Sequence, residues 1–164
     1  MRRLKVLLAE DDDDLRALYG YMLLAAGYKM NTVRNGLEAL DEIQVNRPDV
    51  VVTDIAMPVL TGLDLIVAVR ANDELSDLPV VAITSFGEDM CELACAAGAT
   101  NAINKPTELE TMREMIDAAV SRISSERLRS NGGPLSKPSD KNYTTGATAG
   151  PSTIPPRASN WTSE

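Results

Sequence analysis

Four short segments with strand character end in side chains that can do chemistry. The first is followed by two carboxylates, the second ends in one, the third ends in a hydroxyl and the fourth is followed by an amine. These side chains belong to Glu10 and Asp11, Asp54, Thr84, and Lys105. No histidine occurs anywhere in the 164 residues. Acid–base and nucleophilic chemistry that depends on an imidazole is therefore excluded.

Carboxylates gathered from two neighbouring strands would repel one another. At ~4 Å and an effective dielectric near 20, each like-charge pair costs about 4 kcal/mol. Mg²⁺ relieves such repulsion, because it prefers a few carboxylate oxygens, keeps several waters and accepts a phosphate oxygen. A lysine adds a mobile point charge for an anion, and a hydroxyl can donate a hydrogen bond to it. These groups predict phosphoryl transfer onto a carboxylate, which forms an aspartyl phosphate.

The elements that must position these groups alternate along the first 127 residues. Apolar runs with β-branched residues alternate with segments of helical periodicity, five of each. The predicted strands are 4–9, 29–33, 49–54, 78–85 and 100–104, and the predicted helices are 12–28, 35–46, 62–72, 88–98 and 108–128. On the first two helices, one apolar face is expected to carry Leu15, Leu18, Met22 and Ala26, and Leu37, Leu40 and Ile43, respectively.

This alternation predicts an α/β fold, a doubly wound five-stranded parallel sheet with helices on both faces. A sheet of this size most often has the strand order 2-1-3-4-5. Ligands bind outside the carboxyl ends of the strands, where the order reverses, here between the first and third strands. The polar side chains named above are predicted to meet at that edge.

Composition divides the chain near Leu128. Residues 1–127 hold 12 Lys and Arg against 22 Asp and Glu, whereas residues 128–164 hold 4 against 2. In that tail 20 of 37 residues are Pro, Gly, Ser or Thr, without periodicity. Such a segment buries too little apolar surface to offset chain entropy. We expect one folded domain over 1–127 and a disordered tail over 128–164 with no output domain.

Net charge and cysteine content argue against several classes of binding partner and metal site. The net charge of −8 argues against direct binding of nucleic acid, which requires clustered Lys and Arg. No apolar stretch is long enough to span a membrane, and the N-terminal apolar run is too short for a signal peptide. Cys91 and Cys95 are interpreted as two small buried thiols in a reducing compartment, so a cytoplasmic location is expected. A zinc site of the usual Cys/His kind is not expected with two cysteines and no histidine.

The acidic run after the first strand has a simpler explanation for most of its members. Asp12, Asp13 and Asp14 lie where the helix over 12–28 begins. Negative charge at a helix N-terminus is stabilised by the macrodipole. We therefore expect these three residues to cap that helix mainly, and Glu10 and Asp11 to serve the site.

The whole pattern resembles the receiver domain of bacterial two-component response regulators. The resemblance covers residues 4 to about 125 and depends on four motifs in combination, LLAEDD, VVVTDIAMPVLTG, VVAITS and AGATNAINKP. It implies the flavodoxin-like receiver architecture and a stand-alone, single-domain regulator. It also implies a signalling phosphoacceptor rather than an enzyme, with only self-phosphorylation and dephosphorylation as its own chemistry.

The resemblance also implies a role for each site residue. Asp54 is the phosphoacceptor, charged by a sensor histidine kinase or a His-phosphotransfer protein in a Mg²⁺-dependent in-line transfer. The implied metal ligands are Glu10, Asp11, Asp54 and the main-chain carbonyl of Ala56. Thr84 is the switch hydroxyl, and Lys105 contacts the acyl phosphate.

The sequence departs from the family pattern around the switch. The aromatic residue that the family usually has three positions before the lysine is Ala102 here, and Thr107 follows the KP pair where Phe is frequent. Ala56 occupies the position that tunes hydrolysis of the acyl phosphate, so the lifetime is open. Phe86 either shades the site or packs within its loop.

Without an output domain, such a receiver acts through protein contacts. We expect phosphorylation to change a binding surface around helix 88–98, strand 100–104 and helix 108–128, which a downstream protein reads. No membrane partner is expected, and the sequence leaves monomer and homodimer open.

Three alternatives compete with this interpretation. A pseudo-receiver would bind partners without being phosphorylated, and Ala102 is its main support. A dehalogenase-like phosphatase also uses a strand-end Asp nucleophile, but it requires a second Asp where this chain has Ala56. A flavodoxin-like electron carrier needs a phosphate loop after the first strand, where five acids would repel phosphate.

Overall fold

The computed structural model describes residues 2–105 and 107–130, which belong to one compact unit. Its strands are β1 (Lys5–Ala9), β2 (Lys29–Val33), β3 (Val50–Asp54), β4 (Val80–Thr84) and β5 (Asn101–Asn104). Its helices are α1 (Asp13–Ala25), α2 (Gly36–Val45), α3 (Gly62–Ala71), α4 (Glu88–Ala97) and α5 (Leu109–Ser130). All ten predicted elements are present.

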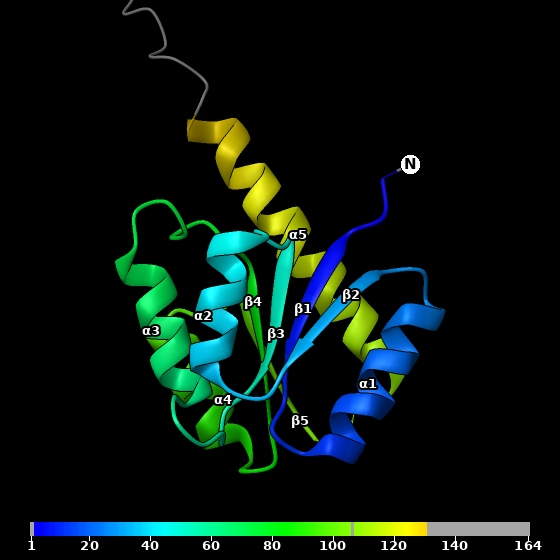
Figure 1. The fold of residues 1–164 in the computed structure, drawn as a ribbon. Coiled ribbons are helices and arrows are strands. Elements are labelled where there is room, and N and C mark those ends of the chain that lie inside the picture. Colours follow the sequence, from blue (N-terminus) through cyan, green and yellow to red (C-terminus); the bar gives the residue numbers. More distant parts are fainter. Residues whose placement is uncertain (1, 106, 131–164) are drawn as a thin grey trace, which may run out of the picture. The chain divides into compact units, whose positions relative to one another are not determined.

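The five strands form one parallel sheet in the order β2-β1-β3-β4-β5, as predicted. Helices α1 and α5 cover one face, and α2, α3 and α4 cover the other (Figure 1). Every residue of β3 and β4 is buried, because helices cover both faces of these strands. This burial explains why the two strands are apolar runs without alternation.

The helix faces that meet the sheet differ from the expected ones in two places. Leu18 of α1 is 51% exposed and Leu37 of α2 is 49% exposed, so their predicted burial is wrong. In α1 the buried side chains are Tyr19 and Leu23, and in α2 they include Ala39 and Ile43. The spacing of four residues from Tyr19 to Leu23 is also helical, and the larger aromatic surface faces the sheet.

Helix boundaries also moved by a few residues. Helix α1 ends at Ala25 rather than at residue 28, since Gly27 has φ +96° and leaves the helix. Asp12 caps this helix by accepting hydrogen bonds from the main-chain N–H groups of Asp14 and Leu15, which confirms the capping interpretation. Helix α5 continues to Ser130, so residues 128–130 are helical rather than disordered. The rest of the predicted tail lies outside the described residues.

The two cysteines differ in environment. Cys91 is buried, as predicted, whereas Cys95 is exposed, so the expectation of two buried thiols is wrong for Cys95. The buried residues of α4 are Cys91 and Ala94, three positions apart, and Cys95 follows them at the surface. Among the described residues, no helix is long and apolar enough to cross a membrane.

Arg70 joins α3 to the α3–β4 and α4–β5 loops, at the end of the sheet opposite the carboxyl ends of the strands. Its guanidinium donates to the carbonyl oxygens of Gly98 at 2.7 Å, Leu78 at 2.8 Å and Ser76 at 3.1 Å. Burial lowers the pKa of this guanidinium below its ordinary value, and the nearby charge of Asp77 offsets this only in part. Two separate nitrogens of the rigid fork, Nε and Nη1, serve these three carbonyls, whereas a lysine would have to reach all of them from a single nitrogen.

We therefore expect Arg70→Lys to lower the free energy of unfolding by about 2–3 kcal/mol. Urea denaturation measures this change. Arg34→Lys is the matched control, since among the described residues the Arg34 side chain makes only an exposed ion pair, with Asp13 at 3.9 Å. The control should shift stability by less than about 0.5 kcal/mol. Equal effects of the two substitutions would contradict this role for Arg70.

Candidate functional site

The predicted site residues meet at the carboxyl edge of the sheet. Glu10 follows β1, Asp54 is the last residue of β3, Thr84 ends β4 and Lys105 follows β5. Lys105 Nζ lies 2.6 Å from Glu10 Oε2 and 3.0 Å from Asp54 Oδ1. Asp11 is exposed beside them, and one oxygen from each of Glu10, Asp11 and Asp54 lies within 4.8 Å of the others. Adjacent parallel strands bring together residues that are far apart in the sequence.

Burial holds the carboxylates of Glu10 and Asp54 close to the ammonium group of Lys105. Glu10 is 1% exposed and Asp54 is 5% exposed. Buried carboxylates are costly without a cation, and the ammonium of Lys105 contacts both. Glu10, Asp54 and Lys105 thus form a compact ion triad, in which burial holds each side chain against its partners.

The pKa directions follow from this crowding. Burial raises the pKa of Glu10 above its ordinary value and the repulsion from Asp54 adds to this, while Lys105 only partly offsets both. Burial alone would lower the pKa of Lys105, but its hydrogen bonds to Glu10 and Asp54 outweigh that and raise it. Two carboxylates within 3.0 Å keep the lysine charged, while burial makes the charged form of Glu10 less favourable than in water.

The main chain around Asp54 is tightly held. The hydroxyl of Thr53 donates to the carbonyl oxygen of Asp54 at 2.8 Å, and the next residue, Ile55, donates its N–H to Ile83 in β4 at 3.2 Å. Gly62 begins α3 directly against this segment, and its N–H donates to the carbonyl of Ile55 at 2.9 Å. The loop from β3 thus closes back onto its own strand, which holds the Asp54 carboxylate in place.

Val59 in this loop has a strained backbone. Its φ is +68°, a left-handed conformation that β-branched residues rarely adopt, and its side chain is exposed. We expect Val59→Asn to raise the free energy of unfolding by about 1 kcal/mol, because asparagine tolerates this conformation. Chemical denaturation measures the gain. Val45→Asn, at an exposed position of α2, is the control and should bring none. A loss of stability at position 59 would contradict the argument.

Thr84 is fully buried at the end of β4. Its hydroxyl oxygen accepts a hydrogen bond from the N–H of Phe86 at 3.1 Å, and its carbonyl accepts one from the N–H of Lys105 at 2.7 Å. Within residues 2–105 and 107–130 the hydroxyl donates to no partner, so its proton is available for an incoming anion. Phe86 itself is 62% exposed, so it does not pack within its loop.

Ala102, Ala56 and Tyr19 complete the surroundings of the site. Ala102 is half-buried in β5 and packs against the core beneath α2, α3 and α4. Ala56 is exposed beside Asp54, and its role as a carbonyl ligand stays a prediction. Tyr19 was not expected at the site from its sequence position. Its hydroxyl forms a hydrogen bond with the main chain of Thr107, and burial raises its pKa, which the charge of Lys105 offsets only in part. Its spacing from Leu23 could have identified it.

The residues present fit a hard divalent cation. Three carboxylate oxygens converge, two of them from buried residues, and oxygen is the ligand that Mg²⁺ prefers. The exposed Asp11 leaves one side of the cluster open to solvent, where water ligands and a phosphate oxygen could lie. The three carboxylates could therefore hold a metal ion beside Asp54.

Comparisons with known proteins agree with this geometry. A model of the response regulator receiver domain matches residues 6–117. The polar-differentiation response regulator DivK of Brucella anthropi is 33% identical over 119 residues, which is 70% of this chain and 97% of that protein. Among solved structures, the chemotaxis protein CheY4 of Vibrio cholerae is 31% identical with a TM-score of 0.67 over 72% of this chain and 99% of that one. A receiver domain protein of Clostridium thermocellum is 25% identical with a TM-score of 0.68 over 75% and 98%.

Proposed function

Because the chain belongs to the response regulator receiver family of two-component signalling proteins, we propose that Asp54 accepts a phosphoryl group from a sensor histidine kinase or a His-phosphotransfer protein. The observation that carries this proposal is the contact of Lys105 Nζ with both Asp54 and Glu10 at the edge of the sheet. It supports an anion-transfer site that is held in place before any phosphodonor arrives. The protein is a signalling regulator, not an enzyme with a separate substrate.

In the proposed transfer, a carboxylate oxygen of Asp54 attacks the phosphorus of a phosphohistidine. A P–O bond to Asp54 forms as the P–N bond breaks and its electron pair stays on the ring nitrogen. The imidazole leaves the phosphorus as a neutral group when its other ring nitrogen carries a proton on the donor protein. Lys105 moves its contact from the carboxylate to an oxygen of the arriving phosphoryl group and neutralises its charge. The hydroxyl of Thr84 then donates a hydrogen bond to a second phosphoryl oxygen. Asp54 needs no base, because an ionised carboxylate is already a nucleophile.

Glu10, Asp11, Asp54 and the carbonyl of Ala56 are the proposed ligands of Mg²⁺. When bound, the ion neutralises the clustered carboxylates and the charge that the phosphoryl group brings. The buried position of Glu10 and Asp54 on rigid strand ends supports this assignment, since it fixes the ligand geometry in advance.

The proposed output is a change of the surface formed by α4, β5 and α5. Thr84 lies at the start of that surface, because its hydroxyl bonds Phe86 in the loop before α4 and its carbonyl bonds Lys105 after β5. Turning the hydroxyl toward a phosphoryl group would release the N–H of Phe86 and shift this loop. In β5, Ala102 has no aromatic ring whose rotamer could change on phosphorylation. We therefore propose that the response lies in the loop before α4 rather than in a side chain of β5.

The test is the intact mass of the protein after incubation with acetyl phosphate and Mg²⁺. We expect one added phosphoryl group on the wild type and none on Asp54→Asn or when Mg²⁺ is omitted. Asp41→Asn, which removes an exposed aspartate of α2, should be labelled like the wild type. If no adduct forms, beryllofluoride binding separates a short-lived acyl phosphate from a site that cannot be phosphorylated. Failure of both would overturn the proposal.

Magnesium binding should also stabilise the fold. At a concentration of 100 Kd, Mg²⁺ is expected to add about 2.7 kcal/mol to the free energy of unfolding, seen as a higher Tm. Asp11→Asn should remove most of this gain, because it deletes a ligand. Asp12→Asn is the matched control: it deletes a charge from the same acidic run but keeps the helix cap. A gain that Asp12→Asn abolishes and Asp11→Asn leaves intact would contradict the ligand set.

A further inference from the structure

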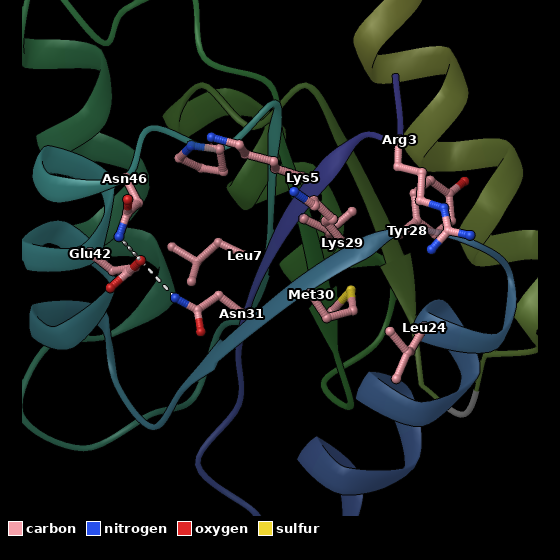
Figure 2. A pocket seen from close by; sticks show the side chains of 12 residues that line it. Arg3, Lys5, Leu7, Leu24, Tyr28, Lys29, Met30, Asn31, Glu42 and Asn46 are labelled. Atoms are coloured by element: carbon pink, nitrogen blue, oxygen red, sulfur yellow. Dashed lines mark hydrogen bonds between the residues drawn. The ribbon is translucent and has the colours of Figure 1, made fainter. Parts of the chain in front are cut away.

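A hollow of about 440 Å³ lies along β2, the strand at the edge of the sheet opposite β5. Figure 2 shows Asn31 of β2 pointing toward Glu42 and Asn46 of α2 on one side of the strand, and Met30 with Leu24 of α1 on the other. None of its lining residues belongs to the phosphoacceptor site. The hollow is therefore separate from the phosphoacceptor site.

Three cations gather around this hollow in a protein whose net charge is −8. They are Arg3, Lys5 and Lys29, all of them exposed. Lys5 and Lys29 are directly opposite each other in the β1–β2 register, where like charges destabilise a sheet. In the part of the chain that the structure describes, none of the three forms an ion pair.

The nearby carboxylates are already engaged with other groups. Glu42 accepts hydrogen bonds from the side-chain amides of Asn31 at 2.6 Å and Asn46 at 3.1 Å. Asp49 pairs with Arg2 and accepts the main-chain N–H of Lys5 at 2.8 Å. The lysine ammonium groups are thus left for an external anion.

The outer side of β2 also offers free main-chain groups. The N–H of Lys29 donates to the carbonyl of Leu4, so residues 29, 31 and 33 direct their main-chain groups toward β1. In a parallel pair the alternate residues, Met30 and Thr32, direct theirs away from β1. Because β2 is an edge strand, no other strand of the sheet pairs with them. An extended chain can add to the sheet there.

An apolar groove accompanies this edge on the α1 side. A second hollow of about 350 Å³ shares Leu24 and Met30 with the first and continues between α1 and β2. Tyr21 and Leu24 of α1 are 73% and 57% exposed along it. Gly20 keeps the groove floor low, since its missing side chain faces Thr32.

We propose that the β2 edge binds an acidic, extended segment of a partner protein by strand addition. The added strand pairs with the outward main-chain groups of Met30 and Thr32. Its side chains alternate between the two faces, so carboxylates meet Lys5 and Lys29 on the α2 side and apolar residues meet Tyr21 and Leu24 on the α1 side. A second copy of this chain is disfavoured, because its own Lys29 would approach the same cations.

This site is separate from the proposed output surface. The strand β5 and its neighbours α4 and α5 lie at the other edge of the sheet, so a partner on β2 leaves them free. The protein can then hold one partner constitutively while the phosphorylated surface selects another. This consequence rests on the proposed output, whereas binding at β2 does not.

The test uses the full chain and a blocked eight-residue peptide that alternates Glu with Val and Tyr. Fluorescence anisotropy should show saturable binding, and a matched peptide with Lys in place of Glu should not bind. The double variant Lys5→Glu and Lys29→Glu should weaken binding about tenfold or more, whereas Arg129→Glu on α5 should leave it unchanged. Hydrogen exchange of the Met30 and Thr32 amides should slow on binding, which surface charge pairing alone would not produce.

Five results would overturn the proposal. The first two are absence of binding and equal binding of the lysine peptide. The third is binding without slower exchange at Met30 and Thr32. The fourth is displacement of the peptide by equimolar pyrophosphate, which would indicate a small-anion site. The fifth is self-association of the chain through this edge, seen by sedimentation and lost in the double variant, which would make a second copy the occupant.

Discussion

Replacing Lys105 with methionine should slow phosphorylation by acetyl phosphate about 10²–10³-fold. Its ammonium lies 3.0 Å from Asp54 and 2.6 Å from Glu10, so it is the cation nearest to the attacking oxygen among the described residues. Removing one positioned group that stabilises developing negative charge typically costs this much. Methionine keeps most of the side-chain volume, so the loss reports charge rather than packing. The rate of adduct formation by intact mass measures the effect.

Two controls separate this effect from a general loss of positive charge or of folding. Lys29→Met removes an exposed lysine at the other end of the sheet and should leave the rate unchanged. The Mg²⁺-dependent rise in Tm should persist in Lys105→Met, because the carboxylates remain. A wild-type rate in Lys105→Met would show that the ion triad is structural and takes no part in the transfer.

Gly62→Ala should be the most damaging small substitution near the site. A Cβ at this position would lie 2.0 Å from the carbonyl oxygen of Asp54 and 2.8 Å from the Cα of Ile55. Both contacts are with main chain, which cannot rotate away as a side chain can. We expect the free energy of unfolding to fall by about 3 kcal/mol. Because the displaced atoms belong to Asp54, the phosphorylation rate of the protein that still folds should fall as well.

Gly20→Ala is the matched control within α1. A Cβ there meets Thr32 at 3.5 Å, an ordinary van der Waals distance. Alanine also favours a helix more than glycine does, so stability should rise by about 0.5–1 kcal/mol. Denaturation of both variants beside the wild type gives opposite signs if this account is right. A neutral Gly62→Ala would contradict the close approach of α3 to Asp54.

The topology and the gathering of polar groups could be predicted from the sequence because both depend on short-range pattern. Alternating strand and helix signals leave few arrangements open, and the strand ends of a parallel sheet share one edge. This is why Asp54 and Lys105, 51 positions apart, were expected together. The motif resemblance then supplied the roles, which pattern alone does not.

The orientation of individual side chains could not be predicted in the same way. The face of α1 that meets the sheet is set by packing against β1, β2 and α5, so Tyr19 is buried and Leu18 is exposed. The ion triad depends on how far Lys105 reaches, which no spacing reveals. The left-handed Val59 contradicts local preference, and a local argument cannot anticipate it.

The β2 edge illustrates the same limit. Lys5 and Lys29 belong to different strands, and only the register β1–β2 shows them side by side. The pairs that matter for this surface are therefore long-range consequences of the fold. The local sequence around either lysine predicts no more than an exposed strand end.

The measurement that tests the central claim most directly is the position of the phosphoryl group on the chain. Protein labelled by acetyl phosphate with Mg²⁺ is reduced with borohydride, which converts an aspartyl phosphate to homoserine, and the modified residue is located by peptide mass spectrometry. We predict homoserine at position 54, in proportion to the adduct seen by intact mass. Homoserine at Asp11 or any other aspartate, or the corresponding longer alcohol at a glutamate, with Asp54 unmodified, would contradict the account.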